Sequence, residues 1–219
     1  MNNKHFLSGL YAITDPELMG DELLAKAEQA IIGGINILQY RNKTASKTEQ
    51  IEEAQILASL CHKHDVLFII NDSVELANEV NADGVHIGQQ DTGIQNARKQ
   101  LGQDKIIGVT CNNKIENAVI AQQQGADYVA FGRFFKSSTK PSAPAAELSI
   151  LKNIKQLISI PVVAIGGITP ANAARLLEYD VDMLAVIESI FGQKDISGST
   201  RQFIDILSHK DDHKVMSDL

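Results

Sequence analysis

The chain has 219 residues, a formal net charge of −7, and 44% apolar and 21% charged residues. This length and composition are ordinary for a globular protein and suffice for one domain with a large core. The negative charge argues against a general binder of nucleic acid or of anionic membranes. It does not exclude an anionic substrate, because a local cluster of Lys, Arg and Mg²⁺ can bind phosphate inside an acidic protein.

The chain carries no sign of export or of a membrane anchor. Residues Met1–Thr14 lack the apolar stretch and small-residue cleavage site of a signal peptide, and no apolar run approaches membrane-spanning length. Cys61 and Cys111 lie far apart without partners at metal-ligand spacing, which favours reduced thiols. We therefore expect a cytoplasmic protein with neither nucleic-acid nor membrane partners. The oligomeric state stays open, including a homo-oligomer.

Short apolar runs alternate with amphipathic stretches along the chain, which predicts alternating strands and helices. In chain order we expect a strand at Gly9–Ile13, a helix at Asp21–Ile32, a strand at Ile35–Tyr40, a helix at Lys47–His64, a strand at Leu67–Ile70, a helix at Val74–Asn78, a strand at Gly84–Ile87 and a helix at Ile94–Leu101. The second half continues with a strand at Ile106–Val109, a helix at Ile115–Gln124, a strand at Tyr128–Phe131, a helix at Glu147–Leu157, a strand at Val162–Ile165, a helix at Pro170–Leu177, a strand at Met183–Ile187 and a helix at Thr200–Leu207.

These eight βα units predict an α/β protein with a single (β/α)8 TIM barrel over residues 1–208. The alternative is an open, doubly wound sheet. Eight is the number of units that closes a barrel, and a short phrase recurs just before several strands. The phrase occurs as Gly34-Ile35-Asn36, Gly125-Ala126-Asp127 and the related Ala82-Asp83-Gly84. Residues 209–219 form a polar tail that we expect to be frayed.

Polar residues follow several predicted strands, at the end where a barrel carries its active face. After the second strand comes Gln39-Tyr40-Arg41-Asn42-Lys43, where alternation sends Gln39, Arg41 and Lys43 to one side and Tyr40 to the other. The other strand ends carry Asn71, Asp72, His86, Gln89, Asp91, Thr110, Glu188 and Ser189. For His86, a structural role and a polar contact to a heterocycle are equally open.

Asp72 and Asp91 follow neighbouring strands, and Arg41, Lys43 and Lys140 surround the same mouth. Paired carboxylates beside several cations suit a Mg²⁺-diphosphate, because the metal takes carboxylate and phosphate oxygens while Arg and Lys hold the rest. For any one of these residues a structural ion pair is the simpler interpretation. Their convergence on one face favours a functional site.

Two further segments point to phosphate binding. Gly166-Gly167 ends the seventh strand and opens a helix, where exposed N–H groups and the helix dipole bind phosphate. Close packing is the simpler interpretation of the two glycines. The segment Lys136–Pro144, rich in Ser, Lys and Pro, is either a passive linker or a mobile lid, and its cations and hydroxyls favour the lid.

Taken together, these residues make the chain resemble the thiamine-phosphate synthase (thiamine-phosphate pyrophosphorylase) family over nearly its whole length. The matching pieces are Leu10-Tyr11-Ala12-Ile13-Thr14-Asp15, Gln39-Tyr40-Arg41-Asn42-Lys43, Asn71-Asp72, Gly84-Val85-His86-Ile87-Gly88-Gln89-Gln90-Asp91, Gly108-Val109-Thr110, Ser137-Ser138-Thr139-Lys140, Ile165-Gly166-Gly167-Ile168-Thr169 and Ile190-Phe191. Each piece alone is a weak signal. Their order along the chain makes the resemblance specific.

The resemblance implies a transferase of thiamine biosynthesis that joins a pyrimidine diphosphate to a thiazole phosphate. Arg41, Lys43 and Lys140 would be catalytic, and Asp72 and Asp91 would hold one Mg²⁺ per subunit. The pyrimidine diphosphate would be bound by Gln39, Tyr40, Arg41, Asn42, Lys43, Asn71, His86, Thr110 and Lys140. The thiazole phosphate would be surrounded by Ser137, Ser138, Thr139, Gly167, Ile187 and Glu188. In this family, diphosphate is understood to leave first, and the thiazole nitrogen captures the resulting pyrimidine-methyl cation.

The chain departs from the family pattern at a few positions. The family often has Gln-Leu-Arg-Glu-Lys where this chain has Tyr40 and Asn42, but these are alternate positions and the cationic side survives. Thr110 and Ser137 keep the hydroxyl of the residues they replace. At Glu188 small residues are common, and a carboxylate beside a phosphate is unfavourable. We expect its side chain to turn away while its backbone N–H binds the phosphate.

Three other functions remain open. A thiazole tautomerase of the same family would leave Arg41, Lys43, Asp72 and Asp91 idle. A non-catalytic regulatory barrel would use the glycines but not the metal pair. A sugar-phosphate isomerase or epimerase, suggested by the fold alone, would need an acid and a base, for which His86 is the obvious candidate.

Overall fold

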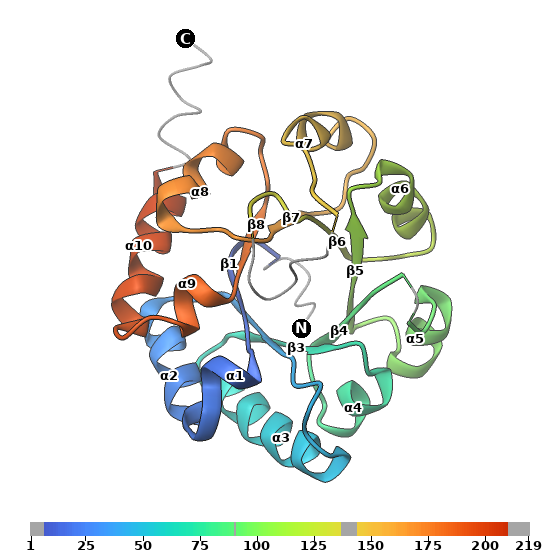
Figure 1. Cartoon of the computed structure of the whole chain (residues 1–219). Coiled ribbons are helices and arrows are strands. Elements are labelled where there is room, and N and C mark those ends of the chain that lie inside the picture. The colour runs from blue at the N-terminus through green and yellow to red at the C-terminus, as the bar shows by residue number, and fades with distance from the viewer. Residues whose placement is uncertain (1–6, 90, 137–143, 210–219) are drawn as a thin grey trace.

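Eight parallel strands close into a barrel, because the first strand pairs with the last as well as with the second (Figure 1). The computed structural model describes residues 7–89, 91–136 and 144–209. The strands are β1 (Gly9–Ile13), β2 (Ile37–Tyr40), β3 (Leu67–Asn71), β4 (Gly84–Ile87), β5 (Ile106–Asn112), β6 (Tyr128–Phe131), β7 (Val162–Ile165) and β8 (Met183–Val186). The predicted barrel is confirmed, and the open doubly wound sheet is excluded.

Helices form a ring around the outside of the strands (Figure 1). They are α1 (Pro16–Met19), the 3-10 helix η2 (Gly20–Glu22), α2 (Leu23–Gly33), α3 (Lys47–Lys63), α4 (Val74–Glu79), α5 (Ile94–Leu101), α6 (Ile115–Gln123), α7 (Ser149–Ile154), α8 (Pro170–Leu177), α9 (Glu188–Phe191) and α10 (Ile196–Ser208). Within the described ranges, no helix combines the length and apolar character needed to cross a membrane. Of the predicted tail at residues 209–219, all but His209 lies outside the described residues.

The last helix is longer than its sequence pattern predicts. It begins at Ile196 instead of Thr200, because the Asp195 carboxylate caps it by accepting a hydrogen bond from Gly198 N at 2.8 Å. Packing then outweighs the weak helix preference of its Gly and Ser residues, since Thr200 and Phe203 are buried. Conversely, α7 covers only six residues of its predicted range. The four-residue helices α1 and α9 are too short for a periodic pattern to reveal.

The phrase that recurs before strands has a structural purpose at the amino ends of the barrel. Asn36 Oδ1 accepts from Leu10 N at 2.8 Å, and Asp83 Oδ2 accepts from Phe68 N at 2.9 Å. Asp127 and Asp182 do the same for Ile107 N and Val162 N, at 2.8 and 2.7 Å. Each side chain thus satisfies an N–H at the start of the neighbouring strand. These residues stabilise the barrel at the end opposite the site.

Alternation along the strands divides the buried apolar side chains into two layers. One layer lies between the strands and the helices. The other fills the barrel interior and includes Tyr11, Ile37, Ile69, Tyr128 and Met183. Because side chains fill the interior, it is a core and not a pore, and a ligand site is expected at the carboxyl ends of the strands.

Candidate active site

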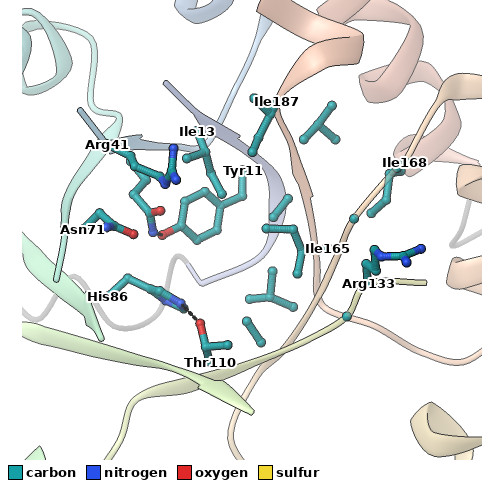
Figure 2. A pocket seen from close by; sticks show the side chains of 18 of the residues that line it. Tyr11, Ile13, Arg41, Asn71, His86, Thr110, Arg133, Ile165, Ile168 and Ile187 are labelled. Atoms are coloured by element: carbon teal, nitrogen blue, oxygen red, sulfur yellow. Dashed lines mark hydrogen bonds between the residues drawn. The ribbon is translucent and has the colours of Figure 1, made fainter. Parts of the chain in front are cut away.

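A cavity of about 500 Å³ opens at the carboxyl ends of the strands, and all eight strands contribute to its walls. Figure 2 shows Arg41, Asn71, His86 and Thr110 around one side of it. The structure brings most of the predicted polar strand-end residues to the walls of this one cavity. Its lining includes the predicted residues Gln39, Arg41, Lys43, Asn71, Asp72, His86, Asp91, Thr110, Gly167, Ile187 and Glu188.

Tyr40 and Asn42 do not reach this cavity. The Tyr40 hydroxyl donates to Glu53 Oε2 at 2.6 Å, and Asn42 Nδ2 donates to the same oxygen at 3.0 Å. Glu53 belongs to α3, so both side chains face the helix layer. Strand alternation separates them from Gln39 and Arg41. The prediction that the Tyr40 and Asn42 side chains contact the pyrimidine diphosphate is therefore wrong.

Four predicted residues, Ser137, Ser138, Thr139 and Lys140, lie outside the described residues. So does most of the Lys136–Pro144 segment to which they belong. Their roles stay predictions.

Acidic and basic side chains meet where β3 and β4 end. Lys43 Nζ lies 2.7 Å from Asp72 Oδ2, and Asp91 Oδ2 accepts a hydrogen bond from Gly88 N at 2.7 Å. Asp72 has a φ of 63°, a conformation that Asp tolerates better than most residues. Burial by itself raises the pKa of Asp72, but the hydrogen bond and the positive charge of Lys43 hold that pKa below its ordinary value. Asp72 is thus held as a carboxylate.

The pair Asp72 and Asp91 fits a Mg²⁺ ion that shares its coordination with a substrate. Mg²⁺ is commonly held by one or two carboxylates, with phosphate oxygens and water completing the shell. Within the described residues, no group of three or more His, Cys, Asp or Glu side chains is placed to enclose a metal alone. The arrangement therefore suits a metal that arrives with, or is completed by, a diphosphate.

Arg41 presents a cation that its neighbours only partly satisfy. Its side chain is 16% exposed, and Nη1 lies 3.8 Å from Asp15 Oδ2. Among the buried side-chain nitrogen and oxygen atoms of the described residues, Arg41 Nε is the one without a hydrogen-bond partner. An unsatisfied buried donor costs about 1–3 kcal/mol. Arg41 lines the cavity, so its side chain is placed to face an anion bound there.

The opposite wall of the cavity is built from backbone at Gly166 and Gly167, with φ values of 104° and 63°. A Cβ on Gly167 would stand 2.1 Å from the Lys136 carbonyl oxygen, so only glycine fits there. Asn172 ties this turn to α8, because its Nδ2 donates to Gly167 O at 3.0 Å and its Oδ1 accepts from Thr169 N at 2.9 Å. The turn is thus held in place at the start of a helix, where N–H groups bind phosphate.

Known proteins are similar to this chain in sequence over nearly its full length. A family model described as thiamine monophosphate synthase matches residues 10–190. The chain belongs to the thiamine-phosphate synthase family. The thiamine-phosphate synthase of Alcanivorax borkumensis is 53% identical over 202 residues, which cover 90% of this chain and 93% of that protein. That of Nitrosospira multiformis is 42% identical over 211 residues, covering 96% and 90%.

A solved structure agrees with this assignment. The thiamine phosphate pyrophosphorylase from Pyrococcus furiosus superposes with a TM-score of 0.87 at 34% identity, covering 95% of this chain and 99% of that one. The (S)-3-O-geranylgeranylglyceryl phosphate synthase from Thermoplasma acidophilum reaches a TM-score of 0.68 at 16% identity, covering 91% and 93%. The second likeness shows only the shared barrel.

The cavity of this thiamine-phosphate synthase family member also contains residues that sequence reasoning passed over. Tyr11 lines it from β1, two residues before Ile13 and on the same face of the strand. Arg133 follows β6 and lies beside Ile168, across the cavity from Arg41 (Figure 2). Strand alternation could have identified Tyr11. Arg133 sits where the family resemblance had no motif, so no signal pointed to it.

Proposed function

We propose that this chain condenses 4-amino-2-methyl-5-(diphosphooxymethyl)pyrimidine with 4-methyl-5-(2-phosphooxyethyl)thiazole to give thiamine phosphate and diphosphate. The observation that supports this most is the presence of two unlike anion sites in one cavity. Arg41, Lys43 and the Asp72–Asp91 pair suit a metal-bound diphosphate, and the glycine turn at Gly166-Gly167 suits a monophosphate. The named relatives support the same reaction.

The chemistry asks mainly for charge neutralisation and positioning. The C–O bond between the pyrimidine methylene and the diphosphate breaks, and diphosphate leaves with the bonding electrons. Arg41 and Lys43 donate hydrogen bonds to the departing oxygens, joined in this proposal by Lys140, and they stabilise the charge that develops there. The thiazole nitrogen then forms the new C–N bond with its lone pair. It loses no proton, so the step needs no general base.

A Mg²⁺ ion, one per subunit, would supply further neutralisation of the diphosphate when bound. Asp72 and Asp91 would hold it on the protein side. Lys43 contacts Asp72 at 2.7 Å, which keeps a cation at this carboxylate before the substrate binds.

The two organic groups would lie in different parts of the cavity. Gln39, Asn71, His86 and Thr110 would contact the pyrimidine diphosphate from β2 to β5. Gly167, Ile187 and Glu188 would surround the thiazole phosphate through their backbone, together with Ser137, Ser138 and Thr139. Glu188 is exposed at the start of α9, so water screens its carboxylate. The proposed reaction requires that the thiazole nitrogen face the carbon that loses diphosphate.

The decisive experiment is release of inorganic diphosphate from the purified protein with both substrates and Mg²⁺. Release should require all three, and thiamine phosphate should form in equal amount. A tautomerase would convert a thiazole without releasing diphosphate, and a regulatory barrel would bind ligand without turnover. Activity on a sugar phosphate alone would indicate an isomerase or epimerase. Any of these three results in place of diphosphate release would refute the proposal.

We also propose a cytoplasmic location, supported by Cys61 and Cys111, which are free, buried thiols. Size-exclusion chromatography with light scattering would show whether the enzyme is a homo-oligomer.

A further inference from the structure

A continuous chain of hydrogen bonds runs through the barrel interior from Gln39 to Thr110, two residues that line the cavity. Gln39 Nε2 donates to the Tyr11 hydroxyl at 2.7 Å, and that hydroxyl lies 2.8 Å from the Tyr128 hydroxyl. The Tyr128 hydroxyl lies 2.9 Å from His86 Nδ1, and His86 Nε2 lies 2.7 Å from Thr110 Oγ1. Figure 2 shows the last contact as a dashed line between His86 and Thr110. The chain thus begins and ends at residues proposed to contact the same substrate.

The central members are held rigidly. Tyr11 and Tyr128 are 1% and 0% exposed. Their rings meet edge to face with centroids 6.0 Å apart, and His86 stacks on Tyr128 with centroids 5.6 Å apart. A Cβ on Gly108 would stand 1.9 Å from Tyr128 Cζ, so a glycine leaves the space that this ring occupies. The polar atoms in the chain therefore cannot readily exchange partners.

Burial also keeps both tyrosines protonated, because it raises the pKa of the Tyr11 and Tyr128 hydroxyls well above the ordinary value. Each hydroxyl consequently has one proton to donate and oxygen lone pairs to accept. A neutral imidazole has one N–H and one acceptor nitrogen. The hydrogen bonds in such a row can all be donated from Gln39 toward Thr110, or all from Thr110 toward Gln39. Each group has a single proton to give along the row, so reversing one bond reverses the others.

In the first direction, the Gln39 amide donates to Tyr11, Tyr11 donates to Tyr128, and Tyr128 donates to His86 Nδ1. The His86 Nε2–H then donates to Thr110. The Thr110 hydroxyl proton is left for the cavity, and so is the Gln39 carbonyl oxygen. The reverse direction presents the opposite pair, an amide N–H from Gln39 and only lone pairs from Thr110.

A diphosphate accepts hydrogen bonds and cannot donate them, so it favours the first direction at Thr110. The amino group of the pyrimidine donates hydrogen bonds, so it favours the same direction at Gln39. Resting on the proposed function, we propose that Tyr11, Tyr128 and His86 are positioning residues that couple these two ends. Their one-way hydrogen-bond chain selects a substrate with a donor group at Gln39 and an anion at Thr110.

The direction of the chain can be observed through His86, which is one of six histidines. Two-bond ¹⁵N–¹H spectra distinguish the ring tautomers, and the His86 signal is assigned by its absence in His86→Gln. The sample is the full chain with the pyrimidine diphosphate and Mg²⁺, with the thiazole phosphate withheld. We expect neutral His86 with its proton on Nε2. A proton on Nδ1, or on both nitrogens, would overturn the proposal.

The coupling can be tested with Tyr11→Phe, which removes the acceptor of the Gln39 amide but keeps the ring. The measured quantity is the ratio of kcat/KM for the 4-amino substrate to that for the analogue with a 4-oxo group. We expect this preference to fall by about tenfold, because the freed amide can turn over and donate to the oxo group. Tyr128→Phe should also raise the KM for the pyrimidine diphosphate, while the KM for thiazole phosphate changes less than about twofold.

The matched control is Tyr179→Phe, since Tyr179 packs against the layer between strands and helices. It should leave the preference unchanged, and thermal unfolding of all variants would report any general loss of stability. If Tyr11→Phe lowers kcat/KM for both pyrimidines by one common factor, Tyr11 merely fills space and the proposal fails. If the pyrimidine diphosphate leaves the histidine spectrum unchanged and the wild type releases no diphosphate, the proposed function has failed instead.

Discussion

The two sides of the cavity offer different means of binding an anion. The charged side comprises Arg41, Lys43, Asp72, Asp91 and Thr110, from the ends of β2 to β5. The glycine side comprises Gly132, Gly166 and Gly167, from the ends of β6 and β7. On the charged side, side chains converge and neutralise one another. On the glycine side, a Cβ at any of the three glycines would clash, so the backbone itself comes forward beside the Arg133 side chain.

This difference matches what happens to each anion in the proposed reaction. A diphosphate that departs needs groups that stabilise growing charge, and mobile cations and a metal do this well. A phosphate that only anchors a substrate needs rigid donors of unchanging charge, and backbone N–H groups at a helix start provide them. Variants on the charged side should therefore change kcat, and those on the glycine side should change KM.

The largest effect should come from removing a carboxylate on the charged side. Asp72→Asn and Asp91→Asn should each lower turnover by about a hundredfold or more, because the metal loses a ligand where charge develops. Steady-state assays over a Mg²⁺ titration measure this, and a chelator should abolish wild-type activity. Asp65→Asn is the matched control, since exposed Asp65 has a similar φ of 56° and precedes β3. Wild-type rates in Asp72→Asn and Asp91→Asn would show that the metal assignment is wrong.

Lys140→Ala should come next, with a loss of roughly ten- to a hundredfold in kcat, because it removes one cation from the leaving diphosphate. The KM for thiazole phosphate should change much less. Rapid-quench measurement of diphosphate formation would separate the chemical step from release. An unchanged kcat with weaker thiazole-phosphate binding would contradict this role and would indicate that Lys140 binds the thiazole phosphate.

Gly167→Ala should raise the KM for thiazole phosphate by about tenfold, comparable to losing one hydrogen bond to a charged group. Its new Cβ would stand 2.1 Å from Lys136 O, at a residue whose φ is 63°. The backbone displacement needed to fit this Cβ should also destabilise the protein by roughly 1–3 kcal/mol. Gly102→Ala separates the two effects, because Gly102 has a φ of 84° but open space around it. It should lower stability without raising KM; equal KM values in wild type and Gly167→Ala would contradict the backbone site.

The smallest effect should come from Glu188→Ser. If the Glu188 side chain points away and only its N–H faces the phosphate, the KM for thiazole phosphate should change by less than about threefold. Binding measured at low and high salt would show any residual repulsion. An improvement of tenfold or more would mean that the carboxylate faces the phosphate and weakens the site.

Much of the fold was predictable because each strand carries its own signal. The bounds of β1, β4, β6 and β7 agree with the sequence pattern, since a buried parallel strand is a short apolar run between turn residues. The bounds of α10 did not, because packing and an Asp195 cap extend it through residues of weak helix preference. The ends of helices and strands depend on tertiary packing, which the hydrophobic pattern of a short segment does not contain.

Within the candidate site, alternation correctly separated Gln39, Arg41 and Lys43 from Tyr40. The same rule contradicted the family-based expectation that Tyr40 and Asn42 contact the substrate, because a motif records neighbours in sequence and not the direction of each side chain. The pairing of Lys43 with Asp72 was likewise not predictable, since both have several charged candidates nearby.

The sequence by itself determined the number of βα units, the face that each strand residue occupies, and the presence of opposite charges at one end of the barrel. These properties follow from residue order and from the period of two along a strand. Only the tertiary structure decided which polar atoms meet. Tyr11 and Tyr128 are 117 residues apart, yet their hydroxyls lie within 2.8 Å because barrel closure brings their inward faces together. Barrel closure thus determines which interior side chains form hydrogen bonds. The local sequence does not predict these partners, because every strand is compatible with many interior neighbours.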